Sequence, residues 1–222
     1  STLDGQFLVC LFNWGWNGAM AVPADFDGDG VCDFGVYDPL SGSWYVAATD
    51  GRVLCWQMPW GWDGALPAPV DMDADKAADF VVYDAASGAW FALGSEGNVL
   101  CWAQTTGGAG GVPVPADYDG DAQIDLAVYD AAAGAWRIRL SGDSAIRTIV
   151  WGGAGLVPVP GDYNGDGACD LAVYDTAGGC WFIYSLAADG ADATGGSVLA
   201  WGVSWGWSGA VPVPGDFDGD GV

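Results

Sequence analysis

The sequence predicts an all-β protein built from repeats of one unit, and two observations support this. An acidic loop recurs along the chain, at intervals of 46, 46, 45 and 54 residues, with its first aspartate at Asp25, Asp71, Asp117, Asp162 and Asp216. Short apolar runs, separated by turns rich in Gly, Ala and Ser, fill the rest of each interval. A period of this length indicates a repeat architecture, and the short runs indicate strands.

Each repeat begins with an apolar strand that contains proline and leads into the acidic loop. These strands are expected at 22–23, 67–69, 112–115, 157–160 and 211–214. Proline has no N–H group to donate to a neighbouring strand. The first strand of each repeat must therefore lie at a sheet edge or turn its prolines away from the partner strand.

Three further strands are expected in each repeat. The second follows the acidic loop, as in Leu-Ala-Val-Tyr-Asp at 126–130. It ends in an aspartate expected to cap the next turn, at Asp38, Asp84, Asp130 and Asp175. The third begins at a tryptophan expected in the core, at Trp44, Trp90, Trp136 and Trp181. The fourth is expected at 53–56, 99–102, 149–151 and 198–201.

Four short strands in each repeat of about 46 residues predict the blades of a β-propeller. The predicted fold is a single domain over residues 1–222, with repeats beginning near 19, 65, 111, 156 and 210. It has four complete blades and an incomplete fifth, and we favour a five-bladed ring over a segment of a larger propeller. An elongated solenoid is the alternative, but one large aromatic residue per repeat favours blades.

The frame of the repeat predicts a split fifth blade. Asp4 aligns with Asp50, and Asp216 aligns with Asp25, so the chain opens on a fourth strand and stops inside an acidic loop. A blade without its middle strands would leave unpaired edges. We expect the native chain to be longer, and strands supplied by another chain are the alternative.

The acidic loops indicate a metal site. We number them loop 1 (25–33), loop 2 (71–79), loop 3 (117–125), loop 4 (162–170) and loop 5, which begins at Asp216. Loop 1 places carboxylates at its positions 1, 3, 5 and 9 and a glycine at position 6. Alternating hard oxygen ligands around a sharp turn suit Ca²⁺. Carboxylates this dense repel one another unless a cation lies between them.

The repeat resembles a known family. Residues 158–175 read Pro-Val-Pro-Gly-Asp-Tyr-Asn-Gly-Asp-Gly-Ala-Cys-Asp-Leu-Ala-Val-Tyr-Asp. This unit is similar to the FG-GAP/VCBS repeats of bacterial surface propellers, which are themselves similar to the calcium-loop blades of integrin α-subunits. The resemblance covers nearly the whole chain and implies a propeller, bound calcium and an extracellular or cell-surface location. It does not imply one function.

The resemblance also implies the calcium ligands. In loop 1 they are Asp25, Asp27, Asp29, Asp33 and the carbonyl of Val31. In the other loops they are Asp71, Asp73, Asp75, Asp79, Asp117, Asp119, Asp121, Asp125, Asp162, Asn164, Asp166, Asp170, Asp216, Asp218 and Asp220. Lys76 and Ala122 replace the position-6 glycine, where a positive φ is strained. Loops 2 and 3 are therefore expected to be the weaker sites.

Composition narrows the function. The formal net charge is −24, with five Lys and Arg residues and no histidine. Of the 29 acidic residues 18 lie in the loops, so much of the negative charge is expected to be metal-ligand charge. Nucleic acid is excluded as a partner because little here could neutralise phosphates. No acid–base pair is evident, so no enzymatic activity is expected. No apolar run is long enough to span a membrane.

Six cysteines, Cys10, Cys32, Cys55, Cys101, Cys169 and Cys180, allow 15 disulfide connectivities. The repeat places several of them at equivalent positions of separate blades, too far apart to form a bridge. Most are expected to be buried thiols, and one disulfide remains an option.

Trp-Gly-Trp triplets occur in only some repeats, at Trp14/Trp16, Trp60/Trp62 and Trp205/Trp207. If five repeats close a ring, these three are consecutive. Two interpretations remain open: an aromatic surface for a sugar or a protein, and packing between neighbouring blades.

The predicted function is that of a secreted, calcium-binding structural or adhesive module at a cell surface or in a matrix. Its expected partner is an extracellular protein or glycan, or further repeats through self-assembly. The alternative is a lectin in which Trp16, Trp62 and Trp207 stack on sugars.

Overall fold

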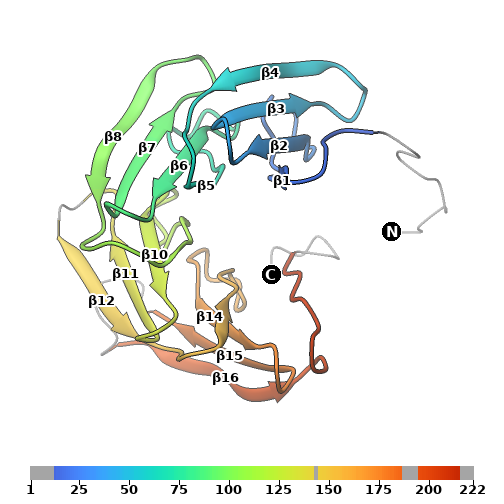
Figure 1. Ribbon diagram of the computed structural model, residues 1–222. Coiled ribbons are helices and arrows are strands. Elements are labelled where there is room, and N and C mark those ends of the chain that lie inside the picture. The colour runs from blue at the N-terminus through green and yellow to red at the C-terminus, as the bar shows by residue number, and fades with distance from the viewer. Residues whose placement is uncertain (1–12, 143–144, 187–194, 216–222) are drawn as a thin grey trace. The chain divides into compact units, whose positions relative to one another are not determined.

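The computed structural model describes residues 13–142, 145–186 and 195–215 (Figure 1). All sixteen regular elements described are β-strands, arranged as four antiparallel sheets of four strands. The prediction of an all-β repeat fold with four strands per repeat is confirmed at this level. The chain divides into an N-terminal half, Ser1–Thr105, and a C-terminal half, Thr106–Val222. Each half contains two of the sheets.

The N-terminal half contains sheets 1 and 2, each in simple chain order. Sheet 1 consists of β1 (Met20–Ala21), β2 (Phe34–Asp38), β3 (Ser43–Ala47) and β4 (Val53–Pro59). Sheet 2 consists of β5 (Ala65–Pro67), β6 (Phe80–Asp84), β7 (Ala89–Leu93) and β8 (Val99–Thr105).

The C-terminal half contains sheets 3 and 4 in the same order. Sheet 3 consists of β9 (Val112–Pro113), β10 (Leu126–Asp130), β11 (Ala135–Arg139) and β12 (Ile146–Val150). Sheet 4 consists of β13 (Leu156–Pro158), β14 (Leu171–Asp175), β15 (Cys180–Ser185) and β16 (Ser197–Ser204).

The proline-containing strands are short edge strands, which explains how they tolerate proline. In sheet 3, the N–H of Val114 donates to the carbonyl of Ala127 over 2.9 Å. Pro113 and Pro115 flank Val114, so their nitrogens fall at the alternate positions, which face away from β10. Val159 makes the same bond in sheet 4, to the carbonyl of Ala172 over 2.8 Å. The alternation of proline thus matches the period of the strand.

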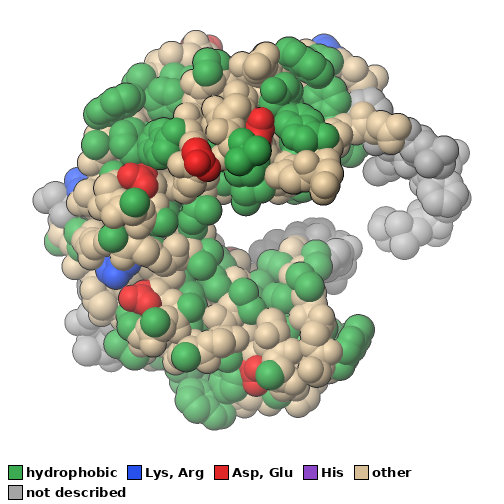
Figure 2. Space-filling view, in the orientation of Figure 1, with side chains coloured by type: hydrophobic (Ala, Val, Ile, Leu, Met, Phe, Trp, Pro, Cys, Tyr) green, Lys and Arg blue, Asp and Glu red, His purple; other side chains and the backbone are tan. Residues whose placement is uncertain are grey.

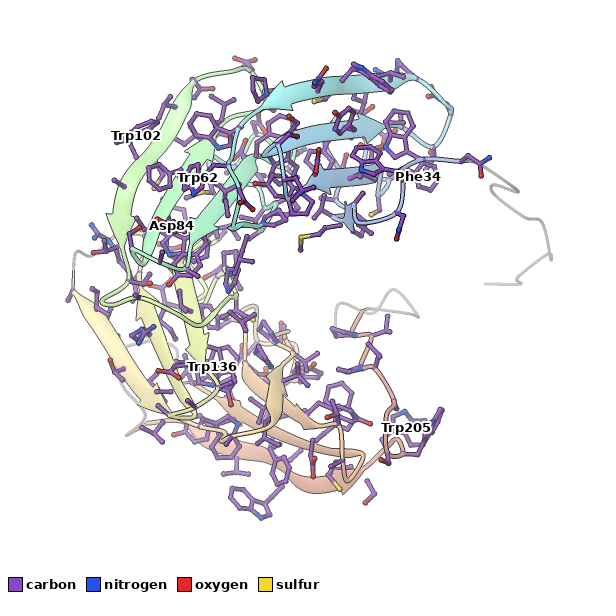
Figure 3. The ribbon with its side chains drawn as sticks, in the orientation of Figure 1. Phe34, Trp62, Asp84, Trp102, Trp136 and Trp205 are labelled. Carbon is purple, nitrogen blue, oxygen red and sulfur yellow. The ribbon has the colours of Figure 1, made fainter. Side chains whose placement is uncertain are left out.

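The core of each half forms between its two sheets. Trp44 is fully buried and packs edge-on against Phe80 of sheet 2, with ring centroids 5.4 Å apart. Its indole N–H donates to the carbonyl of Trp60 over 2.6 Å. Trp136, labelled in Figure 3, is likewise buried and donates to the carbonyl of Trp151 over 2.8 Å.

Three of the four repeated tryptophans match the prediction of a core position. Trp90 is fully buried like Trp44 and Trp136, whereas Trp181 in sheet 4 is only half-buried. The prediction for Trp181 is therefore wrong in degree. The repeat fixes the residue type, but burial depends on what lies against that face of the sheet.

The aspartates that end the second strands cap turns, as predicted. The Asp38 carboxylate accepts the N–H of Leu40 over 3.1 Å and the hydroxyl of Ser41 over 2.7 Å. Asp84, labelled in Figure 3, accepts the N–H of Ala86 over 3.0 Å, and Asp130 and Asp175 make equivalent bonds. These four carboxylates therefore stabilise the turns that follow the second strands.

None of the five described cysteines forms a disulfide with another described residue. Cys101 is buried, Cys55, Cys169 and Cys180 are half-buried, and Cys32 is exposed. The expectation that most of them are buried is met only in part. Cys10 lies outside the described residues.

Candidate metal centres

The acidic loops join the first and second strands of each sheet. Each described loop is closed at its base by an isolated antiparallel bridge: Ala24 with Asp33, Val70 with Asp79, Ala116 with Asp125, and Gly161 with Asp170. The last aspartate of each loop is therefore held by the backbone beside the first. Ligand positions 1 and 9 are brought together in this way.

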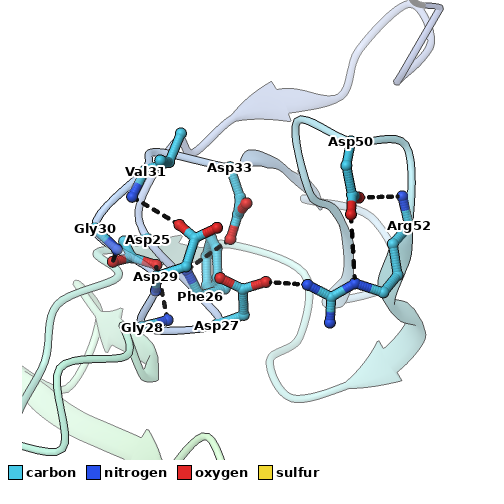
Figure 4. A network of polar contacts seen from close by, with 10 residues as sticks. All are labelled: Asp25, Phe26, Asp27, Gly28, Asp29, Gly30, Val31, Asp33, Asp50 and Arg52. Atoms are coloured by element: carbon cyan, nitrogen blue, oxygen red, sulfur yellow. Dashed lines mark hydrogen bonds and ion pairs between the residues drawn. The ribbon is translucent and has the colours of Figure 1, made fainter.

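In loop 1, backbone N–H groups orient the carboxylates (Figure 4). Asp25 accepts the N–H of Gly28 over 2.8 Å and that of Gly30 over 2.7 Å. Asp33 accepts the N–H of Phe26 over 2.9 Å. The loop thus wraps around its own first aspartate, as a cation-binding loop must before its other carboxylates can converge.

The same wrapping recurs in the other loops. Asp71 accepts the N–H of Lys76 over 2.9 Å, and Asp117 accepts that of Ala122 over 2.8 Å. Asp162 accepts the N–H of Gly167 over 2.9 Å. The backbone N–H of position 6 thus donates to the carboxylate of position 1 in each of these loops, whether position 6 is glycine, lysine or alanine.

Position 6 has positive φ in every described loop, as predicted. Lys76 has φ of 80° and Ala122 has φ of 64°, close to the 83° of Gly30. Ala74, at position 4 of loop 2, also has positive φ, 61°, and this was not anticipated. Loop 2 therefore holds two non-glycine residues in the left-handed region, each at a cost in conformational energy.

Three loops bring three carboxylates within 4.8 Å of one another. The clusters are Asp25, Asp27 and Asp29 in loop 1; Asp71, Asp73 and Asp79 in loop 2; and Asp117, Asp119 and Asp125 in loop 3. These are positions 1, 3 and 5 in loop 1, and positions 1, 3 and 9 in loops 2 and 3. Each cluster is a candidate metal centre.

A serine accounts for the different cluster in loops 2 and 3. The hydroxyl of Ser95 donates to Asp75 over 2.7 Å, and that of Ser141 donates to Asp121 over 3.1 Å. In loops 2 and 3 the carboxylate at position 5 thus accepts a hydrogen bond from a serine that lies outside the loop. Asp29, the position-5 aspartate of loop 1, makes no such bond to a serine among the described residues.

The oxygen atoms of loop 1 fit a hard cation. Oδ1 of Asp27 is buried and has no hydrogen-bond partner in the described part of the chain. A buried carboxylate oxygen without a donor is costly, and a cation bound between Asp25, Asp27 and Asp29 would satisfy it. The donor set is entirely oxygen, which suits Ca²⁺ better than a softer metal.

Without a metal, the buried carboxylates resist ionisation. Burial raises the pKa of Asp79 to about 6, against the N–H bonds from Met72 and Ser95 that lower it. Burial likewise raises the pKa of Asp125 to about 6. Neighbouring aspartates add to both shifts. A bound cation would stabilise the charged form and lower both pKa values.

Loop 4 differs from the first three. Its second ligand position is Asn164, whose amide donates to Asp166 over 3.0 Å and to the hydroxyl of Ser185 over 3.0 Å. No cluster of three carboxylates occurs in loop 4 among the described residues. Asp166 is held by Asn164, and the roles of Asp162 and Asp170 as ligands stay predictions.

The metal prediction also includes loop 5 and the carbonyl of Val31. Asp216, Asp218 and Asp220 of loop 5 lie outside the described residues. The N–H of Val31 donates to Asp29 over 2.8 Å. The expected role of the Val31 carbonyl as a ligand stays a prediction.

Four of the six triplet tryptophans, Trp16, Trp62, Trp205 and Trp207, are exposed, whereas Trp14 and Trp60 are half-buried and Trp60 packs against the core of the N-terminal half. Trp16 is 48% exposed and meets Tyr45 edge-on at 4.9 Å, and Trp62 is 38% exposed and meets Phe91 edge-on at 5.0 Å. Trp207 is 74% exposed. Each ring thus retains a solvent-facing surface, which favours the surface interpretation over packing between sheets.

Sequence reasoning missed a second set of exposed tryptophans, on the outer edge strands. Trp56, Trp102 and Trp201 are 67%, 68% and 71% exposed. They lie opposite Tyr45, Phe91 and Phe182 in the sheet register. Figure 3 shows Trp102 projecting outward from β8. The sequence does carry a signal for this exposure, because neighbouring residues of a strand point to opposite faces. Cys101 is buried, so the adjacent Trp102 points to the exposed face.

Sheet 3 interrupts this aromatic pattern. The corresponding pair there is Arg137 and Thr148, and Thr106 and Gly108 replace the two tryptophans of the triplet. Figure 2 shows that hydrophobic side chains nonetheless cover much of the visible surface, while Lys and Arg side chains appear at few places. The visible face is therefore largely apolar and carries few basic side chains.

Comparison with models of known protein families finds no match, and comparison with curated proteins finds none either. The resemblance to FG-GAP/VCBS repeats stays a prediction that rests on the sequence motif. In the described part of the chain, no helix is long and apolar enough to cross a membrane.

Proposed function

We propose that this chain is a calcium-stabilised β-propeller that acts as a non-catalytic structural or adhesive module outside the cell or at its surface. The observation that carries the proposal is the buried Oδ1 of Asp27, which has no hydrogen-bond partner among the described residues and lies within a cluster of three carboxylates. Two further loops repeat such a cluster. Calcium at these loops would cancel repulsion inside each loop and tie the first two strands of each sheet together.

The carboxylates themselves argue for a structural rather than a catalytic metal. In loop 1, Asp25 and Asp33 are committed to backbone N–H groups, and the turn aspartates are committed to caps. The chain contains no histidine, so the commonest general base is missing from the sequence. Metal ions here would hold the loops in shape.

Calcium titration of the metal-free protein tests the proposal. Isothermal titration calorimetry of the intact chain is expected to show binding that Asp27→Asn reduces by one site. Asp63→Asn, which removes an exposed carboxylate outside the loops, serves as the matched control and should leave the stoichiometry unchanged. The proposal fails if wild type binds no calcium, or if both variants bind as wild type does.

Carbohydrate binding is a second candidate, which the exposed aromatic residues favour. A cavity of about 220 Å³ in the N-terminal half is lined by Asn13, Trp14, Gly15, Trp16, Tyr45 and Trp56. Aromatic faces beside an amide side chain suit a pyranose ring, which presents C–H groups and hydroxyls together. A glycan array with wild type and Trp16→Ala separates the two candidates, because a scaffold shows no selective binding that this variant abolishes.

A further inference from the structure

A cavity recurs at the same place of the repeat in sheets 1 and 4. The sheet-1 cavity is the one of about 220 Å³ described above. The sheet-4 cavity is larger, about 400 Å³, and is lined by Val150, Trp151, Gly152, Leu156, Phe182 and Trp201. Five of these residues are the repeat counterparts of residues that line the sheet-1 cavity, in the order Asn13, Trp14, Gly15, Tyr45 and Trp56.

The last residue of the triplet distinguishes the two cavities. Trp16 lines the sheet-1 cavity and lies edge-on to Tyr45, with ring centroids 4.9 Å apart. In sheet 2, Trp62, labelled in Figure 3, lies in the same way against Phe91 at 5.0 Å. The counterpart in sheet 4 is Gly153, which has no side chain. This position thus supplies an indole ring to sheets 1 and 2 and none to sheet 4.

Sheet 3 also has a glycine here, Gly108, but another side chain fills the space. Arg137 stands in place of the aromatic residue, and its guanidinium donates to the carbonyls of Ala109 over 3.5 Å and Gly110 over 3.3 Å. A Cβ atom added at Gly108 would lie 3.7 Å from Nη1 of Arg137, whereas one added at Gly153 would meet nothing within 4 Å beyond its chain neighbours. Within the described residues, sheet 4 alone leaves this place open.

Three aromatic rings form the walls of the sheet-4 cavity. Trp151 meets Trp201 edge-on with centroids 5.6 Å apart, and Trp201 meets Phe182 edge-on at 5.4 Å. Trp201 is 71% exposed, so the cavity opens to solvent beside it. Walls of this kind suit a flat ligand, because aromatic rings attract one another in edge-on and offset-stacked arrangements.

The two cavities differ in polarity. Asn13 and Tyr45 bring an amide and a phenol to the sheet-1 cavity, whereas their counterparts Val150 and Phe182 bring only hydrocarbon. The indole nitrogens are the only polar side-chain atoms among the residues that line the sheet-4 cavity, and that of Trp151 donates to the Phe182 carbonyl over 3.3 Å. A pyranose would leave several hydroxyls unpaired against such walls, which is costly. The sheet-4 cavity therefore favours an apolar ligand.

We propose that the sheet-4 cavity binds a small planar aromatic compound of about the size of indole. Its ring takes the place that the indoles of Trp16 and Trp62 fill in sheets 1 and 2, edge-on to Phe182 and beside Trp201. The cavity volume lies within the usual range for small-molecule sites. The repeat itself thus indicates the ligand, since the same frame holds an indole of the chain in two other sheets.

Fluorine NMR of the full chain labelled with para-fluorophenylalanine tests the proposal, with indole as the probe. The Phe182 resonance is assigned as the one that is missing from Phe182→Leu. In wild type it is expected to shift saturably as indole is added, and Gly153→Trp should lose this shift because its own ring fills the place. Ala177→Trp is the matched control, since it adds the same side chain at an exposed turn of sheet 4 outside the cavity. It should shift as wild type does.

The backbone at Gly153 should accept the added tryptophan. Tyr129 donates its hydroxyl to the Gly153 carbonyl over 3.2 Å, as Tyr37 donates to the Trp62 carbonyl over 3.3 Å. Gly153→Trp is therefore expected to fold, and circular dichroism verifies this.

Three results would overturn the proposal. The first is a Phe182 resonance of wild type that does not respond to millimolar indole. The second is a response that Gly153→Trp leaves unchanged, because indole would then act from another place. The third is a response to methyl glucoside and not to indole, which would assign the cavity to a sugar.

Discussion

The guanidinium of Arg52 donates to Oδ2 of Asp27, at position 3 of loop 1, whereas Oδ1 of the same carboxylate is buried and has no hydrogen-bond partner among the described residues (Figure 4). Arg52 also lies 3.9 Å from Asp50. The Arg52 side chain is 59% exposed, so the ion pair lies at the surface. The arginine offsets part of the carboxylate repulsion in the metal-free loop.

This pair predicts that Arg52 weakens calcium binding at loop 1. Arg52→Ala is expected to lower the melting temperature of the metal-free chain and to raise calcium affinity several-fold, because calcium would then relieve more repulsion. Arg52→Lys, which keeps the charge but loses the planar fork, should fall between wild type and Arg52→Ala. Calorimetric titration measures the affinity, and an unchanged or weaker affinity in Arg52→Ala contradicts the prediction.

Chelation is expected to destabilise the folded chain. A ligand that binds only the folded state stabilises it by mass action, by about 2.7 kcal/mol per site at a hundredfold excess over Kd. Excess chelator should therefore lower the melting temperature by several degrees. An identical melting curve with and without chelator would argue against structural calcium.

Loops 1 and 2 should contribute unequally to that stability. Asp29 belongs to the carboxylate cluster of loop 1, whereas Asp75 lies outside the cluster of loop 2 and accepts the Ser95 hydroxyl. Asp29→Ala is therefore expected to lower the calcium-loaded melting temperature more than Asp75→Ala. Differential scanning calorimetry of both variants decides the order, and the reverse order would contradict the ligand assignment.

The pH dependence of stability should change sign with calcium. Asp79 and Asp125 have pKa values of about 6 in the metal-free fold, above the ordinary value of 3.8. Their contribution to stability is thus fully present below about pH 4 and is lost as the pH rises through about 6. Metal-free protein should melt at a lower temperature at pH 7 than at pH 5.

Calcium reverses this trend because it binds the ionised carboxylates. In excess calcium the melting temperature should rise over the same interval of pH. Asp79→Asn, which cannot ionise, should flatten the dependence of the metal-free chain. Thermal melts followed by circular dichroism across this interval measure both trends. A metal-free chain that gains stability from pH 5 to pH 7 would contradict the prediction.

Local features of the fold were predictable from the sequence because a few residues dictate them. The alternation of prolines at 113 and 115 matches the period of a strand, and Lys76 had to adopt positive φ where Gly30 does. The bonds that close the loops join residues a few positions apart. Such features depend on residues close together in the sequence, so they can be recognised within one repeat. Similar patterns then recur at the same positions of the other repeats.

Features that depend on contact between distant residues were not predictable. Arg52 reaches Asp27 across 25 residues, and Ser95 reaches Asp75 across 20. The residues equivalent to Arg52 and Ser95 are not the same in every repeat, so the periodic pattern did not predict either contact. The half-burial of Trp181 has a similar cause, because burial depends on a neighbouring sheet and not on the tryptophan itself.

The exposed and buried tryptophans should respond differently to truncation. Trp16 and Trp62 keep exposed faces and contact single rings of their own sheets, whereas Trp44 is fully buried between two sheets. Replacing Trp16, Trp62 and Trp207 together with Ala should leave calcium-dependent melting nearly intact. Trp44→Ala should cost about 3–5 kcal/mol of the free energy of unfolding, as large-to-small core changes do.

Urea unfolding in calcium buffer measures both variants under one condition. If the triple variant retains wild-type stability but loses glycan or protein binding, the aromatic surface is a binding site. If it retains both stability and binding, the tryptophans are bystanders at the surface. A triple variant that unfolds like Trp44→Ala would show that these rings belong to the packed core, and the surface interpretation would then be wrong.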